Sequence, residues 1–303
     1  MSVVTEQKAV SVKPRGQEKI RFRLPSAAIL GVLPFFAYVA ILLVVPTLYL
    51  VVGAFQSQSG GFTIQNVTEL LQSQYLNAYL TSVEVSGITA VVGALFGLFV
   101  AAAAISEGIP RWIRQLLSTF SGVAANFAGI PLAFAFIATL GLNGVATILL
   151  KDMGLDIYKM GFTLFSLAGL SITYIYFQLP LMILVILPTL DGLRKEWREA
   201  AANLGASRLQ FWLHIGLPIL MPSFLASLVL LFGNAFSAYA TPYALTSGYL
   251  NIVTVLIGSV LNGNVTASPQ LGDALAFGMI VIVAATMFVY GILQRRAERW
   301  LRR

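Results

Sequence analysis

The side chains best suited to chemistry are scarce in this sequence. It contains no cysteine and one histidine, His214, so disulfides, thiol catalysis and zinc–thiolate sites are excluded and a histidine metal cluster cannot form. It has no GxxxxGK[ST] segment that could hold nucleotide phosphates. We therefore expect no catalytic residue, metal or cofactor in this chain, and no enzymatic activity.

Three polar residues stand inside long apolar runs. Glu84 is the one ionisable residue clearly within such a run, and an acid in an apolar environment is a candidate for function. It could meet a cationic solute at an outer mouth, or it could lie among lipid headgroups or cap a helix. Asn126 and Gln178 lie deeper, where hydrogen bonding between helices explains them as well as contact with a solute does.

A second polar group lies in the apolar run after residue 215. It contains Asn234, Ser237, Tyr239 and Thr241. Positions 234, 237 and 241 would share one face of a continuous helix, and a polar face on an apolar helix avoids lipid. The face either packs against another helix or borders a solute path, and the nearby Gly233 and Pro242 could interrupt the helix there. These residues complete the candidate translocation path.

The apolar runs themselves predict the fold class. The 303 residues are 58% hydrophobic and 10% charged, which is too little charge for the surface of a soluble domain. Six runs are long enough to cross a bilayer as helices, the form that satisfies backbone groups in lipid. We predict an all-α polytopic membrane protein with six transmembrane helices, at 27–55, 76–105, 116–142, 164–190, 215–245 and 275–293.

The basic residues predict the orientation. Of the 19 Lys and Arg, only Lys151 and Lys159 fall outside four segments: the first 24 residues, 106–115, 191–214 and the stretch after 293. Positive residues mark cytoplasmic segments, so both termini are expected in the cytoplasm. The same clustering beside spans argues against a nucleic-acid-binding face. The expected organisation is a flexible cytoplasmic arm (1–24), a membrane domain (25–293) and a basic cytoplasmic tail (294–303).

The segment 191–218 between the fourth and fifth runs is the most informative. It reads DGLRKEWREAAANLGASRLQFWLHIGLP. Helix formers precede Gly205, which should end a surface helix, and Ser207 could cap the next one. Small alanines leave one side of that helix narrow enough to enter a groove on a partner. The alternative is an amphipathic loop lying on the headgroups.

This segment resembles the EAA signature of binding-protein-dependent ABC importer permeases. That signature is Glu-Ala-Ala, three residues, Gly, nine residues and Ile-x-Leu-Pro, and it lies in a cytoplasmic loop between spans. The matching residues here are Glu199, Ala200, Ala201, Gly205, Ile215, Leu217 and Pro218. The resemblance implies the type I importer architecture, with a permease fold of the methionine-importer type.

The resemblance also implies function and partners. Such a permease does no chemistry but forms the translocation path, and its EAA helix couples to cytoplasmic ATPase subunits. Two ATPases bind ATP and Mg²⁺, a second permease subunit (identical or homologous) completes the pore, and an extracytoplasmic binding protein delivers substrate. The implied location is a bacterial or archaeal cytoplasmic membrane, surrounded by lipid.

Three further stretches, at 174–193, 232–248 and 271–278, are similar to the spermidine/putrescine-type branch of these permeases. This similarity implies a small polar solute such as a polyamine as substrate. The competing classes are a secondary transporter or channel, an exporter permease and a membrane-embedded enzyme. The EAA spacing argues against the first two. One histidine and no cysteine leave little material for the nucleophile–base pair, metal cluster or paired carboxylates that the third would need.

Overall fold

The computed structural model describes residues 26–106, 109–263 and 268–301, so the predicted arm at 1–24 lies outside the described residues. The described part is helical, and its only bridge of β type joins Gln56 to Phe62. The chain divides into two units, Met1–Leu48 and Tyr49–Arg303, each of which is described by itself. The predicted all-α class is confirmed.

Two π-helical turns stand directly before prolines. Helix α1 (Ser26–Val39) continues through the π-turn η1 (Ala40–Val44) into α2 (Val45–Ala54), whose second residue is Pro46. The second π-turn, η2 (Trp212–Gly216), comes before Pro218 in the same way. Proline has no N–H and its ring crowds the preceding turn, so a locally widened helix accommodates it without ending.

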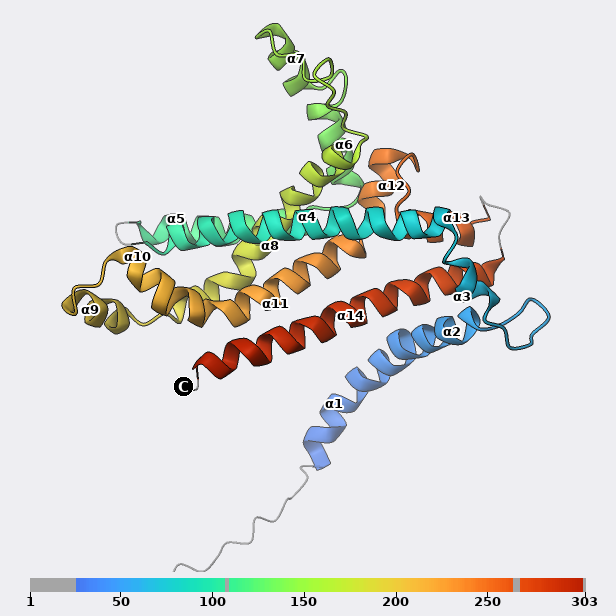
Figure 1. Ribbon diagram of the computed structural model, residues 1–303, viewed down its shortest axis with the longest axis horizontal. Coiled ribbons are helices and arrows are strands. Elements are labelled where there is room, and N and C mark those ends of the chain that lie inside the picture. The colour runs from blue at the N-terminus through green and yellow to red at the C-terminus, as the bar shows by residue number, and fades with distance from the viewer. Residues whose placement is uncertain (1–25, 107–108, 264–267, 302–303) are drawn as a thin grey trace, which may run out of the picture. The chain divides into compact units, whose positions relative to one another are not determined.

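The predicted number of six spans is confirmed. Within the described residues, six helical stretches are long and apolar enough to cross a membrane: Gly31–Ala54, Ser73–Ala104, Ile130–Asp152, Leu167–Asp191, Arg208–Phe236 and Pro269–Arg295. The second and fourth are the continuous helices α4 (Ser73–Ala104) and α8 (Leu167–Asp191). The last lies within α14 (Pro269–Leu301), which continues as helix into the expected tail (Figure 1).

Two predicted spans are interrupted. The prediction of the third span as a single helix at 116–142 is wrong. Helix α5 (Arg111–Asn126) ends, the chain bends at 127–129, and α6 (Ile130–Leu140) and α7 (Val145–Asp152) follow. Pro131 stands in the first turn of α6, where its missing N–H costs no helical hydrogen bond. The fifth, expected at 215–245, runs from α10 (Arg208–Phe211) through η2 to α11 (Leu217–Phe236), breaks, and resumes as α12 (Ala240–Thr246).

The expected outer loops contain helices. Helix α7 lies in the segment that follows the third predicted span, and α3 (Gln65–Glu69) and α13 (Val253–Leu261) were not predicted. Most of the first half of α13 is buried, with Val253 at 0% and Val255 at 4% exposure. The segment 246–272 is therefore in part a folded-back helix that packs into the protein, where protein groups surround its apolar side chains.

Helices α4 and α8 pack closely because α4 presents glycines to α8. A Cβ atom added at Gly93 would lie 2.7 Å from the Cβ of Gln178, and one at Gly97 would lie 2.6 Å from the Cβ of Met182. The pair forms a GxxxG motif, which lets helix backbones approach in a membrane where hydrophobic burial drives no association. The small residues of this span therefore serve close packing of two helices.

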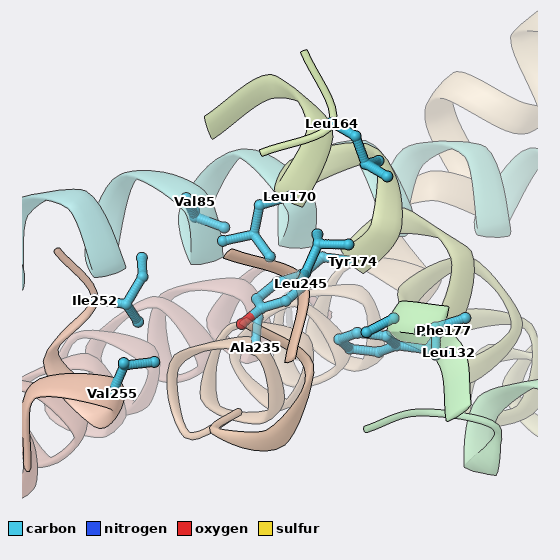
Figure 2. Packing of buried hydrophobic residues seen from close by; sticks show 11 residues of the cluster. Val85, Leu132, Leu164, Leu170, Tyr174, Phe177, Ala235, Leu245, Ile252 and Val255 are labelled. Atoms are coloured by element: carbon cyan, nitrogen blue, oxygen red, sulfur yellow. The ribbon is translucent and has the colours of Figure 1, made fainter. Parts of the chain in front are cut away.

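Three buried clusters hold the second unit together. One of them draws Val85 from α4, Leu132 from α6, Tyr174 from α8, Leu245 from α12 and Val255 from α13 (Figure 2). This cluster joins α6 of the third span and α11 and α12 of the fifth span to the two continuous helices. It packs beside the breaks, around which most of the candidate path residues lie.

Candidate functional site

The EAA segment forms a short exposed helix ended by a glycine turn. Helix α9 (Lys195–Asn203) stops where Gly205 takes a φ of +79°. The Gly205 N–H donates to the Ala202 carbonyl at 2.9 Å, and the Ala206 N–H donates to the Ala201 carbonyl at 3.0 Å. These two bonds are a Schellman motif, which satisfies the last carbonyls of the helix and requires a left-handed residue. The predicted turn at Gly205 is confirmed.

The chain then enters the fifth span without a further loop. The Ser207 hydroxyl accepts from the Gln210 N–H at 3.2 Å, and the Ser207 N–H donates to Gln210 Oε1 at 2.7 Å. This capping box starts a helix that continues through α10, η2 and α11 to Phe236, as the cap expected at Ser207 implies. A displacement of α9 therefore acts on a span across one short turn.

The motif residues divide into an outer and an inner set. Glu199 is exposed and forms an ion pair with Lys195 on the same helix, at 3.5 Å. Ala200 is exposed whereas Ala201 is buried, so Ala201 faces the protein and Ala200 does not. Ile215 lies in the π-turn, and Leu217 and Pro218 begin α11. Glu199 and Ala200 are thus available to a partner, and the other motif residues shape the turn and the span.

The two interrupted spans meet at their breaks. The Gly129 N–H, at the break between α5 and α6, donates to the Thr241 hydroxyl of α12 at 2.9 Å. Gly129 has a φ of +77°, which favours glycine. Helices α6 and α12 lie side by side (Figure 1). Interrupted helices are typical of solute sites in transporters, because their free backbone ends can face a polar cavity.

Four candidate path residues flank these breaks. Asn126 is the last residue of α5, Asn234 lies in the last turn of α11, and Ser237 and Tyr239 lie between α11 and α12. All four are exposed, and Tyr239 stacks on Tyr243 with ring centroids 5.4 Å apart. The predicted common helical face of 234, 237 and 241 is wrong, because α11 ends at Phe236 and Thr241 is buried in the contact with Gly129.

The remaining two candidates lie apart from the breaks. Gln178 is fully buried, and its Nε2 donates to the Leu231 carbonyl of α11 at 2.8 Å. It therefore makes a hydrogen bond between two helices, which was one of the two roles considered for it. Glu84 is exposed within α4, eleven positions after the first residue of that helix, and therefore caps no helix. It lies one turn from Leu80 and Ile88, which are exposed on the same face.

The structure adds residues that the sequence did not single out. The Ser82 hydroxyl of α4 accepts from the N–H of Val253 at 2.9 Å, and the Thr254 hydroxyl donates to the Ala238 carbonyl at 2.8 Å, so both hold the start of α13. Asp273 is a second carboxylate within a span, packed against Gly53. The predicted start at 275 left it out. The short apolar run 252–257 was the available signal for α13.

Comparison with known proteins agrees with this architecture. Residues 93–303 match the family described as "Binding-protein-dependent transport system inner membrane component". The spermidine/putrescine transport system permease protein PotB of Haemophilus influenzae is 26% identical over 278 residues, covering 87% of this chain and 94% of that protein. PotB of Escherichia coli is 26% identical over 86% of this chain and 94% of its own length. A probable sulfate transport system permease protein of Anthoceros angustus is 29% identical over 55% of each.

Solved structures share the fold. A bacterial ABC transporter involved in the import of alginate matches with a TM-score of 0.70 at 19% identity, covering 89% of this chain and 95% of that chain. The bacterial alginate ABC transporter in complex with a pentasaccharide-bound periplasmic protein gives a TM-score of 0.68 at 20% identity, over 89% and 94%. With most of its length matched, this chain belongs to the family of binding-protein-dependent transport system inner membrane components, the permease subunits of ABC importers, and is most like the spermidine/putrescine-type branch.

Proposed function

We propose that α9 is the element through which cytoplasmic ATPase subunits drive this permease. The observation that carries the proposal is the geometry of α9: it is exposed at Glu199 and Ala200, and one glycine turn joins it to the fifth span. A helix that is accessible at one end and continuous with a span at the other can transmit a displacement into the membrane. ATP and Mg²⁺ bind the ATPase partners, and this chain binds neither.

The proposed assembly contains two ATPase subunits, a second permease subunit and an extracytoplasmic binding protein. Both termini and α9 lie in the cytoplasm of a bacterial or archaeal cell. The distribution of Lys and Arg supports this orientation, since the segments on the α9 side hold nearly all of them. The exposed motif residues support the proposal of an ATPase as a partner. The family's dependence on binding proteins supports the proposal of a binding protein that delivers the substrate.

Charge reversal on α9 tests the coupling. Glu199→Lys should leave the permease in the membrane but reduce ATP-driven uptake by roughly tenfold or more, because a charge-assisted contact with the ATPase becomes a repulsion. Glu196→Lys is the matched control, since it makes the same charge change on the same exposed helix outside the motif. Uptake and co-purification of the ATPase are measured together. Equal uptake by the two variants would reject the role of Glu199.

The proposed substrate is a small cation of the polyamine class. Likeness to two PotB proteins supports it, although the identity is only 26%. Electrostatics points the same way: Glu84 is exposed on α4, and the expected outer segments 56–75 and 246–272 contain no Lys or Arg. Lys151 and Lys159, in the third outer segment, are balanced by Asp152 and Asp156, so Glu84 leaves the outer side with an excess of negative charge, which favours positive solutes. The likeness to a probable sulfate permease makes sulfate the second candidate.

Uptake into reconstituted vesicles, with the cognate binding protein and ATPase present, distinguishes these substrates. Labelled spermidine or putrescine should accumulate with ATP, and Glu84→Gln should weaken that accumulation. Sulfate should not accumulate. Sulfate uptake that Glu84→Gln leaves unchanged or increases would contradict the polyamine assignment while leaving the coupling role of α9 intact.

A further inference from the structure

A large cavity opens beside the EAA segment. It has a volume of about 1080 Å³ and lies between the last turns of α4, helix α9 and the helix that runs from α10 into α11. Its lining has two chemically distinct parts. One wall is apolar and includes Leu95, Leu98, Phe99, Leu213 and Leu217, and the rim is charged, with Lys195, Arg198, Glu199 and Arg208.

The apolar wall belongs to membrane-spanning helices. Leu95 and Phe99 lie in the span Ser73–Ala104, and Leu213 lies in the span Arg208–Phe236. In the isolated chain these three side chains are 44%, 71% and 53% exposed. A wall of exposed leucine and phenylalanine on two spans suits hydrocarbon and is poorly hydrated by water. A water-soluble partner such as an ATPase can reach the rim but not this wall.

The rim is net positive. Lys195, Arg198 and Arg208 face one carboxylate, Glu199, which lies 3.5 Å from Lys195. The Arg198 guanidinium lies over the Phe211 ring, 5.6 Å from its centroid, so it is held at the mouth of the cavity. Glu196 of α9 and Arg194, which directly precedes that helix, do not line the cavity and are of opposite sign. The cavity therefore combines an excess of positive charge at its mouth with an apolar interior.

We propose that this cavity binds an anionic phospholipid, with the phosphate among Lys195, Arg198 and Arg208 and the acyl chains along α4 and α11. Basic pockets between spans at a membrane surface suit anionic headgroups, whereas a zwitterionic headgroup brings a cation toward the same rim. The chain's own first 24 residues are a poor occupant, because their six Lys and Arg outnumber two Glu and would be repelled by that rim. A lipid satisfies both parts of the lining at once.

A lipid in this position contacts both α4 and the EAA helix α9. Where the proposed coupling role of α9 holds, the anionic lipid would steady α9 against the span before the ATPase moves it. Lipid binding itself is independent of that role and is measured separately from transport. If the complex shows no preference for anionic lipid but its coupling to the ATPase is intact, the lipid site is rejected and the proposed role of α9 is not.

Native mass spectrometry of the intact transporter complex tests the proposal. The detergent-purified complex is titrated with dioleoylphosphatidylglycerol or dioleoylphosphatidylcholine. The phosphatidylglycerol should bind more tightly, and the double variant Lys195→Gln/Arg208→Gln should lose roughly fivefold in its affinity for each charge removed. The matched control Lys151→Gln/Lys159→Gln removes the same charge from exposed positions far from the cavity in sequence and should bind as the unaltered chain does. Equal binding of the two lipids, or an unchanged preference in the rim variant, would overturn the proposal.

A second pair of measurements keeps the test decisive if the rim variant fails to assemble. The double variant Ala102→Phe/Ala103→Phe keeps every charge but adds two large side chains to the wall, which fill the cavity. It should lower phosphatidylglycerol binding at least tenfold. A photoreactive benzoylphenylalanine at Leu213 reports the occupant directly. Crosslinking to lipid supports the proposal, whereas crosslinking to a second permease, to the ATPase or to the chain's own N-terminal arm overturns it.

Discussion

Glycines determine two local geometries on which the transport role depends. Gly205 supplies the left-handed residue that ends α9, and Gly97 brings the backbones of α4 and α8 into contact. The first is a requirement of the backbone itself, because nothing lies within 4 Å of a Cβ added at Gly205. The second is a requirement of space. Substitutions at these two positions should therefore fail for different reasons, one in coupling and one in folding.

Gly205→Val should reduce transport without preventing membrane insertion. A β-branched residue with positive φ costs about 1–2 kcal/mol, so the turn would open and the orientation of α9 would change. Gly205→Asn should retain most uptake, since asparagine tolerates this conformation. Uptake and membrane yield are compared for the two variants. Normal uptake by the valine variant would show that the turn geometry is dispensable.

Gly97→Ala should lower thermal stability. The new methyl group would lie 2.6 Å from the Cβ of Met182, so α4 and α8 must separate, at about 1–3 kcal/mol. Gly87→Ala is the matched control on the same helix, because nothing lies within 4 Å of its Cβ position. Thermal unfolding of the purified protein in detergent gives the comparison. Equal midpoints for the two variants would contradict the close packing of these helices.

At the scale of elements, the two breaks are the feature that unites the candidate path. Thr241 joins them through its hydrogen bond with the Gly129 N–H, and four of the candidate polar residues flank them. The clustering arises because both spans stop at the same place, not because the residues share a helix face. The buried side chain of Thr241 holds the two breaks together, and the exposed polar side chains around them are the candidates for contact with a solute.

Thr241→Val should destabilise the contact between the breaks. The valine keeps the shape but leaves the Gly129 N–H without its acceptor, at about 1–3 kcal/mol. Thr241→Ser should retain the hydrogen bond and stability. Thr139→Val is the control, since Thr139 is exposed and its hydroxyl donates within its own helix. Complex yield and unfolding temperature are measured, and equal stability of Thr241→Val and the control would reject the link.

Asn234→Ala should change transport while assembly and basal ATP hydrolysis survive, because the side chain is exposed beside the break. Tyr239→Phe should do the same through loss of its hydroxyl. Asn143→Ala, in the exposed loop between α6 and α7, is the control. Wild-type uptake in both path variants would remove these residues from the path, as would loss of assembly as their sole defect.

The sequence predicted the elements better than their interruptions. Length and hydropathy are enough to find six spans, because lipid imposes both. The breaks at 127–129 and 237–239 are invisible to hydropathy, since alanine, phenylalanine and tyrosine continue the apolar run across them. They depend on tertiary contacts such as that of Gly129 with Thr241. Helix α13 was missed for the same reason: nine residues are too few to span, and burial by other helices stabilises it.

At the scale of the whole molecule, the asymmetry of charge predicts the orientation. The chain has no cysteine, so single introduced cysteines report one position each. Cysteines at Gly60 and Gly263 should react with an impermeant reagent from outside the cell, and a cysteine at Arg194 should react only after the membrane is opened. Labelling of position 194 from outside would reverse the orientation and remove α9 from the reach of a cytoplasmic ATPase.

The coupling of α9 to an ATPase is the central claim, and site-directed crosslinking measures it most directly. A single cysteine replaces the exposed Ala200, and a matched variant carries its cysteine at the exposed Met153, directly after α7. With a short bifunctional reagent, position 200 should crosslink to the ATPase subunit in a yield that changes when ATP is added, and position 153 should not. Absence of an ATPase crosslink at position 200 in the assembled, transport-competent complex would contradict the account.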